Sequence, residues 1–174
     1  MISVAQALDA LFALVSPLDV EDVPLREAHG RVLARSVAAQ RSQPPFAASA
    51  MDGYAVTEAA QGLRLRVIGE AAAGRRFAGR VGAGEAVRIF TGAPVPEGAK
   101  TVVIQEDVTR RGNLITLGHR IDDKDNIRPA GGDFTQGEEL TAPRILRPAD
   151  VALLAAMNVA RVPVTRKPAI AILA

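Results

Sequence analysis

A short stretch that runs from Pro44 to Val56 constrains the fold more than any other part of the chain. Its two leading prolines lack a backbone N–H and have a fixed φ, so the approach to this stretch cannot lie inside a helix. Near its end, Asp52 precedes a glycine, which adopts backbone conformations closed to most residues, and Tyr54 begins a strand-like sequence. An acid at a loop-to-strand junction is positioned by the backbone, as binding and catalytic carboxylates usually are. An Asp-Gly pair can equally do no more than cap a turn.

The composition is that of a globular chain without cysteine. With 174 residues, of which 48% are hydrophobic, the chain can bury one ordinary core or two small ones. No apolar run approaches the roughly 20 residues of a membrane span, and the N-terminus lacks the pattern of a secretory signal. The lack of cysteine excludes thiol catalysis, disulfides and thiolate metal sites. We therefore expect a cytoplasmic protein that does not enter a membrane.

The charge pattern argues against nucleic-acid binding. The formal net charge is only +2, and the basic residues, mostly arginines, are scattered along the chain. Aromatic residues make up 3% and tryptophan is absent, so the stacking platforms of single-strand binders are missing. An arginine-rich surface does suit small oxyanions, because the guanidinium group binds them through two parallel hydrogen bonds.

The outer parts of the chain predict a mixture of helices and strands. A capping box of Ser3 and Gln6 precedes apolar residues at helical spacing, which predicts a first helix. Prolines at first helical positions predict two more helices, which begin at Pro24 and Pro148. Extended segments are expected at 20–23, 32–38 and 159–164.

The middle of the chain predicts strands. Between residues 53 and 140 no helical period is convincing, and short alternating segments follow one another with Gly and Pro turns between them. A credible hairpin turn lies at Arg111–Asn113. This spacing is typical of a small antiparallel β-sandwich or barrel. The strands expected from the alternation are 63–68, 86–90, 101–105 and 114–117.

The predicted fold class is mixed α+β. A discontinuous α/β N-terminal domain is expected from residues 1–43 and 141–166, with a small antiparallel β-sandwich or barrel domain, residues 44–140, inserted into it. Residues 167–174 are expected to be a linker and the first strand of a further α/β domain. The apolar run at 169–174 is typical of a strand buried on both faces of a parallel sheet. We therefore expect the natural protein to continue.

Two further stretches place polar residues at backbone turns. In Phe90–Ala99, a predicted strand is followed by a turn where the Thr91 hydroxyl and the Gly92 amide could contact an anion. An ordinary loop between two strands would have the same sequence pattern. The second stretch places Arg128 and Asp133 around a Gly-Gly turn. They could pair with each other, or each could face a ligand, with one binding an oxyanion and the other a metal.

Together the three stretches resemble the molybdopterin molybdenumtransferase family. These are the MoeA-type molybdenum insertases, related to the C-terminal part of gephyrin. Ser49–Ala55, Thr91–Ala99 and Asn126–Asp133 have the order and spacing of that family, and the resemblance extends over essentially all 174 residues. It implies an enzyme of molybdenum-cofactor biosynthesis, which inserts molybdenum from molybdate into adenylylated molybdopterin and hydrolyses the adenylate with Mg²⁺ or another divalent cation.

The resemblance also implies roles for single residues. The positions tied to activity in the family are Asp52, Thr91, Arg128 and Asp133. Cofactor-binding positions are Ser49, Met51, Gly53 and Gly92, and metal-binding positions are Asp52 and Asp133. Family members are elongated homodimers, in which the inserted domain of one subunit helps to complete a site on the partner's third domain. Molybdopterin adenylyltransferase and molybdoenzyme-maturation proteins are the further partners that the resemblance implies.

The chain departs from the family pattern in two places. Ala47 and Ala48 stand where the family usually has Asp-Asn, and Gly132 stands where it often has an acid. The missing groups either supported the loop or formed part of the site. Because most cofactor contacts of the family lie beyond the sequence given, we expect this chain alone to be inactive. The alternatives to the insertase are a protein-interaction scaffold module, as in gephyrin, and a small-anion-binding domain.

Overall fold

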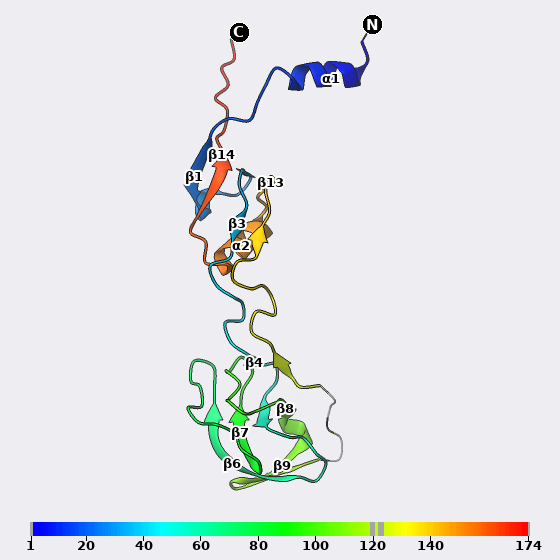
Figure 1. Cartoon of the computed structure of the whole chain (residues 1–174), viewed down its shortest axis with the longest axis vertical. Coiled ribbons are helices and arrows are strands. Elements are labelled where there is room, and N and C mark those ends of the chain that lie inside the picture. The colour runs from blue at the N-terminus through cyan, green and yellow to red at the C-terminus, as the bar shows by residue number, and fades with distance from the viewer. Residues whose placement is uncertain (1, 119–120, 122–123, 174) are drawn as a thin grey trace. The chain divides into compact units, whose positions relative to one another are not determined.

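The structure is a computed structural model that describes residues 2–118, 121 and 124–173 (Figure 1). The chain forms two compact units, the second inserted into the first. The first consists of Met1–Arg41 and Gln136–Ala174, and the second of Ser42–Thr135. The segment 136–140, placed by sequence in the inserted domain, belongs to the first unit because two of its residues pair with strand β3 (Val37–Ala38).

The first unit is built on an antiparallel sheet. The sheet has the strand order β1 (Val20–Pro24), β14 (Arg161–Thr165), β2 (Val32–Leu33) and β13 (Arg144–Ile145). A smaller pair joins β3 to β12 (Glu139–Leu140). The helices are α1 (Val4–Phe12), α2 (Pro148–Ala156) and the 3₁₀ turn η1 (Leu25–Glu27). The core packs fully buried side chains from the sheet, from α2 and from the segment between β13 and α2, among them Leu33, Leu146, Leu154 and Val162.

Helix α1 forms where the sequence predicts it but buries none of its residues. The Ser3 hydroxyl accepts the Gln6 N–H at 3.2 Å, and the Gln6 side chain accepts the Ser3 N–H at 2.9 Å, so the capping box is confirmed. Its apolar face is exposed, with Phe12 at 68%. The helix therefore rests on its cap and its propensity rather than on packing in this chain.

The helix expected from Pro24 is wrong, whereas the helix from Pro148 is confirmed. Pro24 is the last residue of β1, and only one 3₁₀ turn follows it. The Leu25 N–H donates to the Ala160 carbonyl oxygen at 3.0 Å, which ties the start of the segment to a neighbouring strand. Helix α2 ends as expected before Asn158, whose φ of 63° is left-handed.

The apolar run near the C-terminus forms no strand among its described residues. Ile170, Ile172 and Leu173 are 81%, 90% and 96% exposed. None of the sheets in the described part of the chain includes these residues. The expected strand would belong to a further α/β domain, so it stays a prediction.

The second unit is built on a six-stranded curled sheet (Figure 1). Its order is β8 (Thr101–Ile104), β5 (Gly53–Val56), β7 (Glu85–Ile89), β6 (Arg64–Ala71), β10 (Leu114–Leu117) and β9 (Val108–Arg111). The four expected strands and the turn at Gly112 are confirmed. Strands β6 and β7 run parallel, so the wholly antiparallel sheet is wrong; the chain crosses over between them through residues 72–84.

Both faces of this sheet are covered. Tyr54, Leu65 and Ile115 belong to a cluster on one face, and Val87 and Val102 belong to a cluster on the other. Adjacent residues of one strand enter different clusters, as the period of two requires. The sheet is therefore a rigid base for the loops at the ends of its strands.

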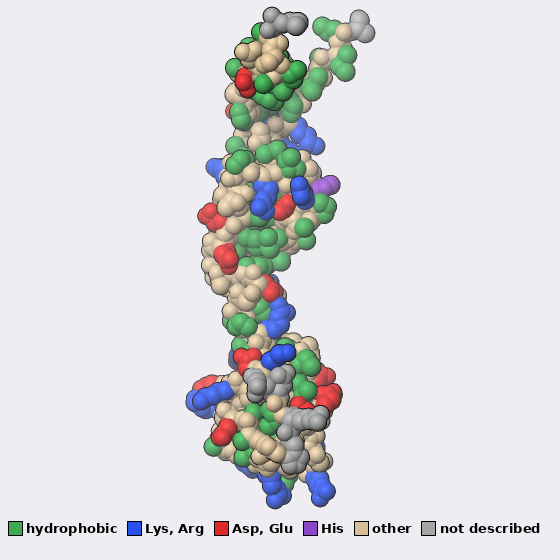
Figure 2. All heavy atoms as spheres, turned by 90° about the vertical axis from the view of Figure 1, so that its right-hand side faces the viewer, with side chains coloured by type: hydrophobic (Ala, Val, Ile, Leu, Met, Phe, Trp, Pro, Cys, Tyr) green, Lys and Arg blue, Asp and Glu red, His purple; other side chains and the backbone are tan. Residues whose placement is uncertain are grey.

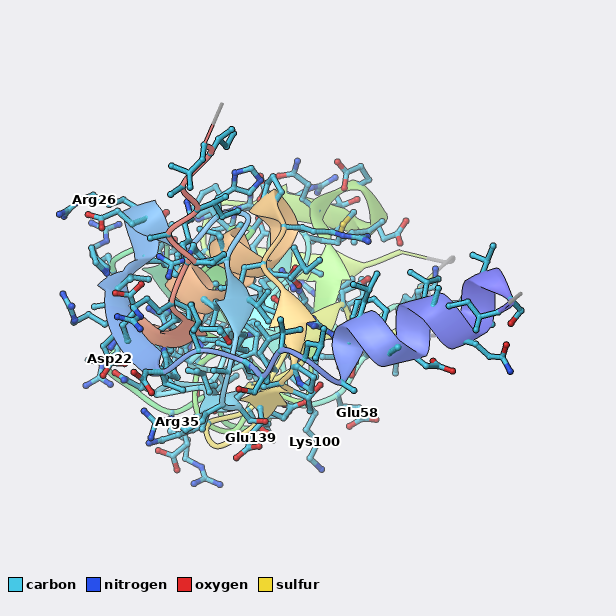
Figure 3. All side chains as sticks on the ribbon, turned by 90° about the horizontal axis from the view of Figure 1, so that it is seen from above. Asp22, Arg26, Arg35, Glu58, Lys100 and Glu139 are labelled. Atoms are coloured by element: carbon cyan, nitrogen blue, oxygen red, sulfur yellow. The ribbon has the colours of Figure 1, made fainter. Side chains whose placement is uncertain are left out.

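Most charged side chains lie at the surface, whereas Arg31 is buried and pairs with Glu21. Asp22, Arg35 and Glu139 project away from their ribbons (Figure 3). Positive and negative groups are interspersed on the face that Figure 2 shows, in keeping with the net charge of +2. Within the described residues, no helix has the length and hydropathy to cross a bilayer.

Candidate functional site

The three stretches singled out in the sequence meet in the second unit at the short strand β4 (Ala48–Ser49). On one side, Ser49 N–H donates to the Ala93 carbonyl at 3.0 Å, and Gly92 N–H donates to the Ser49 carbonyl at 2.9 Å. On the other side, β4 pairs with β11 (Ile127–Arg128), in which Ile127 lies opposite Ser49. The strand of the first stretch is therefore held at both edges by the other two.

Asp52 follows β4 and is fixed by Thr91. The backbone N–H and the hydroxyl of Thr91 each donate to Oδ1 of Asp52 at 2.8 Å. The Asp52 carbonyl accepts the N–H of Gln105 at 3.0 Å. Both Thr91 donors meet the same oxygen, so neither of them occupies Oδ2. One oxygen of Asp52 is thus held by Thr91, and the second can face a ligand.

These contacts keep Asp52 ionised. The Thr91 N–H, followed by the Thr91 hydroxyl, lowers the pKa of Asp52 below its ordinary value; desolvation opposes them, and the charge of Arg88 adds to them. At neutral pH the group is therefore a carboxylate. A carboxylate that holds its proton weakly is a poor general base but a good acceptor for a bound water or a ligand for a hard cation.

Ser49, Met51 and Gly53 shape the turn around Asp52. The buried Ser49 hydroxyl donates to the Met51 carbonyl at 2.6 Å, and the Met51 side chain is exposed. The φ of Gly53 is not positive, so conformational freedom is the wrong reason for this glycine. A Cβ there would lie 2.1 Å from the Val103 carbonyl oxygen. Gly53 lets β5 and β8 approach each other.

Gly92 has a left-handed φ of 80°, as a glycine in a tight loop can. Its N–H is used by the Ser49 carbonyl, and both donors of Thr91 are used by Asp52. These donors are therefore used within the fold, which in this structure favours the ordinary loop over the anion contact, the two alternatives that the sequence left open. The Thr91 hydroxyl oxygen keeps its acceptor capacity.

Arg128 and Asp133 pair with each other, which was one of the two alternatives. Their Nη2 and Oδ1 atoms are 2.7 Å apart, and the two side chains are 55% and 46% exposed. Gly131, between them, has a φ of 71° and makes the turn possible. Because an exposed ion pair is worth about 0–1 kcal/mol, either group can turn to a ligand at little cost.

The two acids do not form a metal site by themselves. No group of three or more acid or histidine side chains lies together in the described part of the chain. Asp133 is engaged by Arg128, and Asp52 offers one oxygen. Mg²⁺ is commonly held by one or two carboxylates together with substrate phosphates and waters, so these residues could supply only part of such a shell.

Sequence reasoning missed Arg88. Its guanidinium carbon lies 4.5 Å from the ring centre of Phe90 and 5.2 Å from that of Tyr54. The strand alternation carried a signal, because Arg88 shares a face with the fully buried Ala86. A charged side chain on the same strand face as a buried residue needs a polar or aromatic partner, because an unpaired charge is costly to desolvate.

Comparison with known proteins gives a consistent picture. Residues 2–158 match the family model described as MoeA N-terminal region (domain I and II). Molybdopterin molybdenumtransferase of Haemophilus influenzae is 37% identical over 150 residues, 84% of this chain and 37% of that protein. The protein of the same name from Nostoc is 35% identical over 184 residues, 99% of this chain and 42% of its own length.

A solved structure agrees with the sequence comparisons. The molybdopterin biosynthesis MoeA protein from Pyrococcus horikoshii OT3 matches with a TM-score of 0.80 and 38% identity. The match covers 97% of this chain and 46% of that one. The chain thus spans less than half the length of these relatives.

Proposed function

Since this chain belongs to the family of the MoeA N-terminal region, we propose that it is the N-terminal part of a molybdenum insertase. The reaction proposed for the whole protein transfers molybdenum from molybdate to adenylylated molybdopterin and hydrolyses the adenylate. The relatives' name, molybdopterin molybdenumtransferase, supports this assignment. The observation that carries it is the carboxylate of Asp52, held by Thr91 at the strand where the three stretches meet.

In this proposal Asp52 acts as an ionised acceptor. Both donors of Thr91 fix one oxygen, so the direction of the second is set before substrate arrives, which reduces the ordering that binding requires. Its lowered pKa favours orienting a water, or contributing to a cation shell, over removing a proton. Arg128 can leave Asp133 to bind an oxygen of molybdate or of the adenylate phosphate.

We include a divalent cation, with Mg²⁺ the first to test. Asp52 and Asp133 would each provide at most part of its shell, and phosphate oxygens and waters would complete it. Such a cation would neutralise charge on the phosphoanhydride during hydrolysis. The residues of this chain keep the roles given above: Asp52 presents a fixed oxygen and Arg128 binds an anionic one.

The proposal also covers assembly and location: a cytoplasmic homodimer that receives its substrate from a molybdopterin adenylyltransferase and serves molybdoenzyme maturation. The exposed apolar face of helix α1 supports association with another chain. Its exposed side chains are Val4, Leu8, Leu11 and Phe12. Contiguous exposed apolar surfaces often mark sites of protein contact.

A scaffold module is the second candidate, and Ala47 and Ala48 are the observation that favours it. A copy kept for protein binding could lose the carboxylate and the amide that the family usually has there. A small-anion-binding domain is the third. It predicts that this chain alone binds molybdate or AMP, and a flat calorimetric titration would remove it.

The test is an insertion assay on the full-length protein that contains this chain. Purified protein is mixed with adenylylated molybdopterin, molybdate and Mg²⁺, and AMP release and bound molybdenum are measured. We expect turnover by the wild type and at least a hundredfold loss in Asp52→Asn, a typical scale for a group that orients a reactant. Arg80→Gln is the control, since Arg80 forms an exposed ion pair with Glu97 in the same unit. A folded wild type that releases no AMP would contradict the proposal.

A further inference from the structure

Arg88 touches the residues on either side of the Asp52–Thr91 contact. Its Nη1 donates to the carbonyl of Gly53, the residue after Asp52, at 3.0 Å. The guanidinium carbon lies 4.5 Å from the ring centre of Phe90, the residue before Thr91. One side chain thus contacts the neighbours of both partners.

The same guanidinium reaches a third segment. Nη2 of Arg88 donates to Oε1 of Gln105 at 2.6 Å. The N–H of Gln105 donates to the Asp52 carbonyl at 3.0 Å, so the residue that holds Arg88 also holds the main chain of the acid. The guanidinium carbon also lies 5.2 Å from the centre of the buried Tyr54 ring, so the same group contacts the core.

We propose that Arg88 is a positioning residue that fixes the Asp52–Thr91 contact by fastening Gly53, Phe90 and Gln105 to one guanidinium. Lysine could not replace it, because a single ammonium lacks the planar fork that meets two acceptors in fixed directions. The functional meaning of this role rests on the proposed function, since it matters for insertion only if Asp52 does. The structural role itself does not depend on the reaction.

Two amide protons report on this role and a third serves as an internal reference. The Thr91 N–H is bonded to the Asp52 side chain, and the Gln105 N–H is bonded to the Asp52 carbonyl. The Gly92 N–H lies one residue further along the same loop but is bonded to the carbonyl of Ser49, which is not among the Arg88 contacts described above. Loss of positioning would therefore free the first two and leave the third protected.

The experiment is amide hydrogen exchange followed by NMR on this chain in the absence of any ligand. Arg88→Met keeps an apolar stem for the aromatic rings but removes the guanidinium donors. We expect exchange at Thr91 and Gln105 to become about tenfold faster, the scale of one lost hydrogen bond to a charged group, and exchange at Gly92 to stay within twofold. Arg66→Met is the matched control on the same sheet, because Arg66 pairs with the surface acid Glu85.

Two results would overturn the proposal. One is a folded Arg88→Met chain in which Thr91 exchanges within twofold of the wild-type rate. The other is equal acceleration at Gly92, which would mean general loosening of the loop. If Arg88→Met does not fold, Arg88→Lys is used instead. Exchange at Thr91 and Gln105 is again expected to become faster than in the wild type, and exchange at Gly92 to stay unchanged. No substrate is used, so a negative exchange result would contradict the positioning role of Arg88 without bearing on the insertase function. A negative insertion assay would contradict the insertase function without bearing on the exchange result.

Discussion

Thr91 donates both its backbone N–H and its hydroxyl to the same oxygen of Asp52, 39 residues away in sequence, at 2.8 Å each. Two donors on one oxygen orient the carboxylate, and neither of them occupies its second oxygen. In the proposed function, Thr91 orients Asp52, and Asp52 would meet the ligand.

Thr91→Val should raise the pKa of Asp52. The hydroxyl contact disappears while the backbone N–H remains, so the pKa should move toward its ordinary value without reaching it. Because the pKa of Asp52 is lower in the folded state than in the unfolded state, its ionisation stabilises the fold above the unfolded-state pKa, and this stabilisation is lost as pH falls through the folded-state pKa. In Thr91→Val the two pKa values should lie closer together, so the pH range over which stability changes should be narrower. Carboxyl ¹³C NMR titration of this chain measures the pKa. Thr91→Ser is the control and should titrate like the wild type, and unchanged titration of Thr91→Val would contradict the role of the hydroxyl.

Gly53→Ala should destabilise the second unit. The added Cβ would meet the Val103 carbonyl oxygen at 2.1 Å, so β5 and β8 must separate. Such overpacking typically lowers the free energy of unfolding by about 1–3 kcal/mol, which urea unfolding followed by circular dichroism can measure. In Gly82→Ala the new Cβ meets only the flexible carboxylate of Glu85, at 3.2 Å, and a change within about 0.5 kcal/mol is expected. Equal stability of both variants would refute the close-approach explanation.

Arg128→Ala and Asp133→Ala should have little effect on stability, whereas Arg128→Ala should lower activity. The pair is about half exposed, so either change should alter the free energy of unfolding by less than about 1 kcal/mol. In the insertion assay of the full-length protein, Arg128→Ala should lower kcat/KM by tenfold or more, since it removes an oxyanion ligand. Full activity of Arg128→Ala would contradict a role for this ion pair in insertion.

The alanines at 47 and 48 can be tested one at a time. Ala47 is partly exposed, so Ala47→Asp should leave the free energy of unfolding within about 0.5 kcal/mol. Ala48 is 6% exposed, and a buried amide there without partners should cost about 1–3 kcal/mol, measured by the same urea unfolding. If Ala48→Asn is instead as stable as the wild type, its amide finds partners in the loop, and the family's Asn would be a support of that loop.

The sequence was informative where a local rule applies. The capping box of Ser3 and the hairpin at Gly112 depend on neighbouring residues alone, and both form as predicted. The alternation of β6 and β7 located both strands but carries no information on their relative direction, so their parallel pairing was missed. The apolar run at Ile170 is exposed in this chain, and the strand expected there stays a prediction.

The site was predicted as residues rather than as geometry. The resemblance named Asp52 and Thr91 as positions tied to activity but did not predict their contact, which depends on how the strand at Ser49 pairs on both edges. An anion contact for the donors of Gly92 and Thr91 was one of two alternatives, and the fold uses these donors itself. Arg88 was missed because its role depends on three segments that the sheet assembles.

The most direct test is complementation of a bacterial strain that lacks its molybdenum insertase, using the full-length gene that encodes this chain and nitrate reductase activity as the readout. We predict rescue by the wild type and by Arg80→Gln. We predict loss of rescue with Asp52→Ala and with Thr91→Ala, at equal protein levels. Failure of the expressed, folded wild type, or rescue by Asp52→Ala as complete as that by the wild type, would contradict a role for this carboxylate in molybdenum insertion.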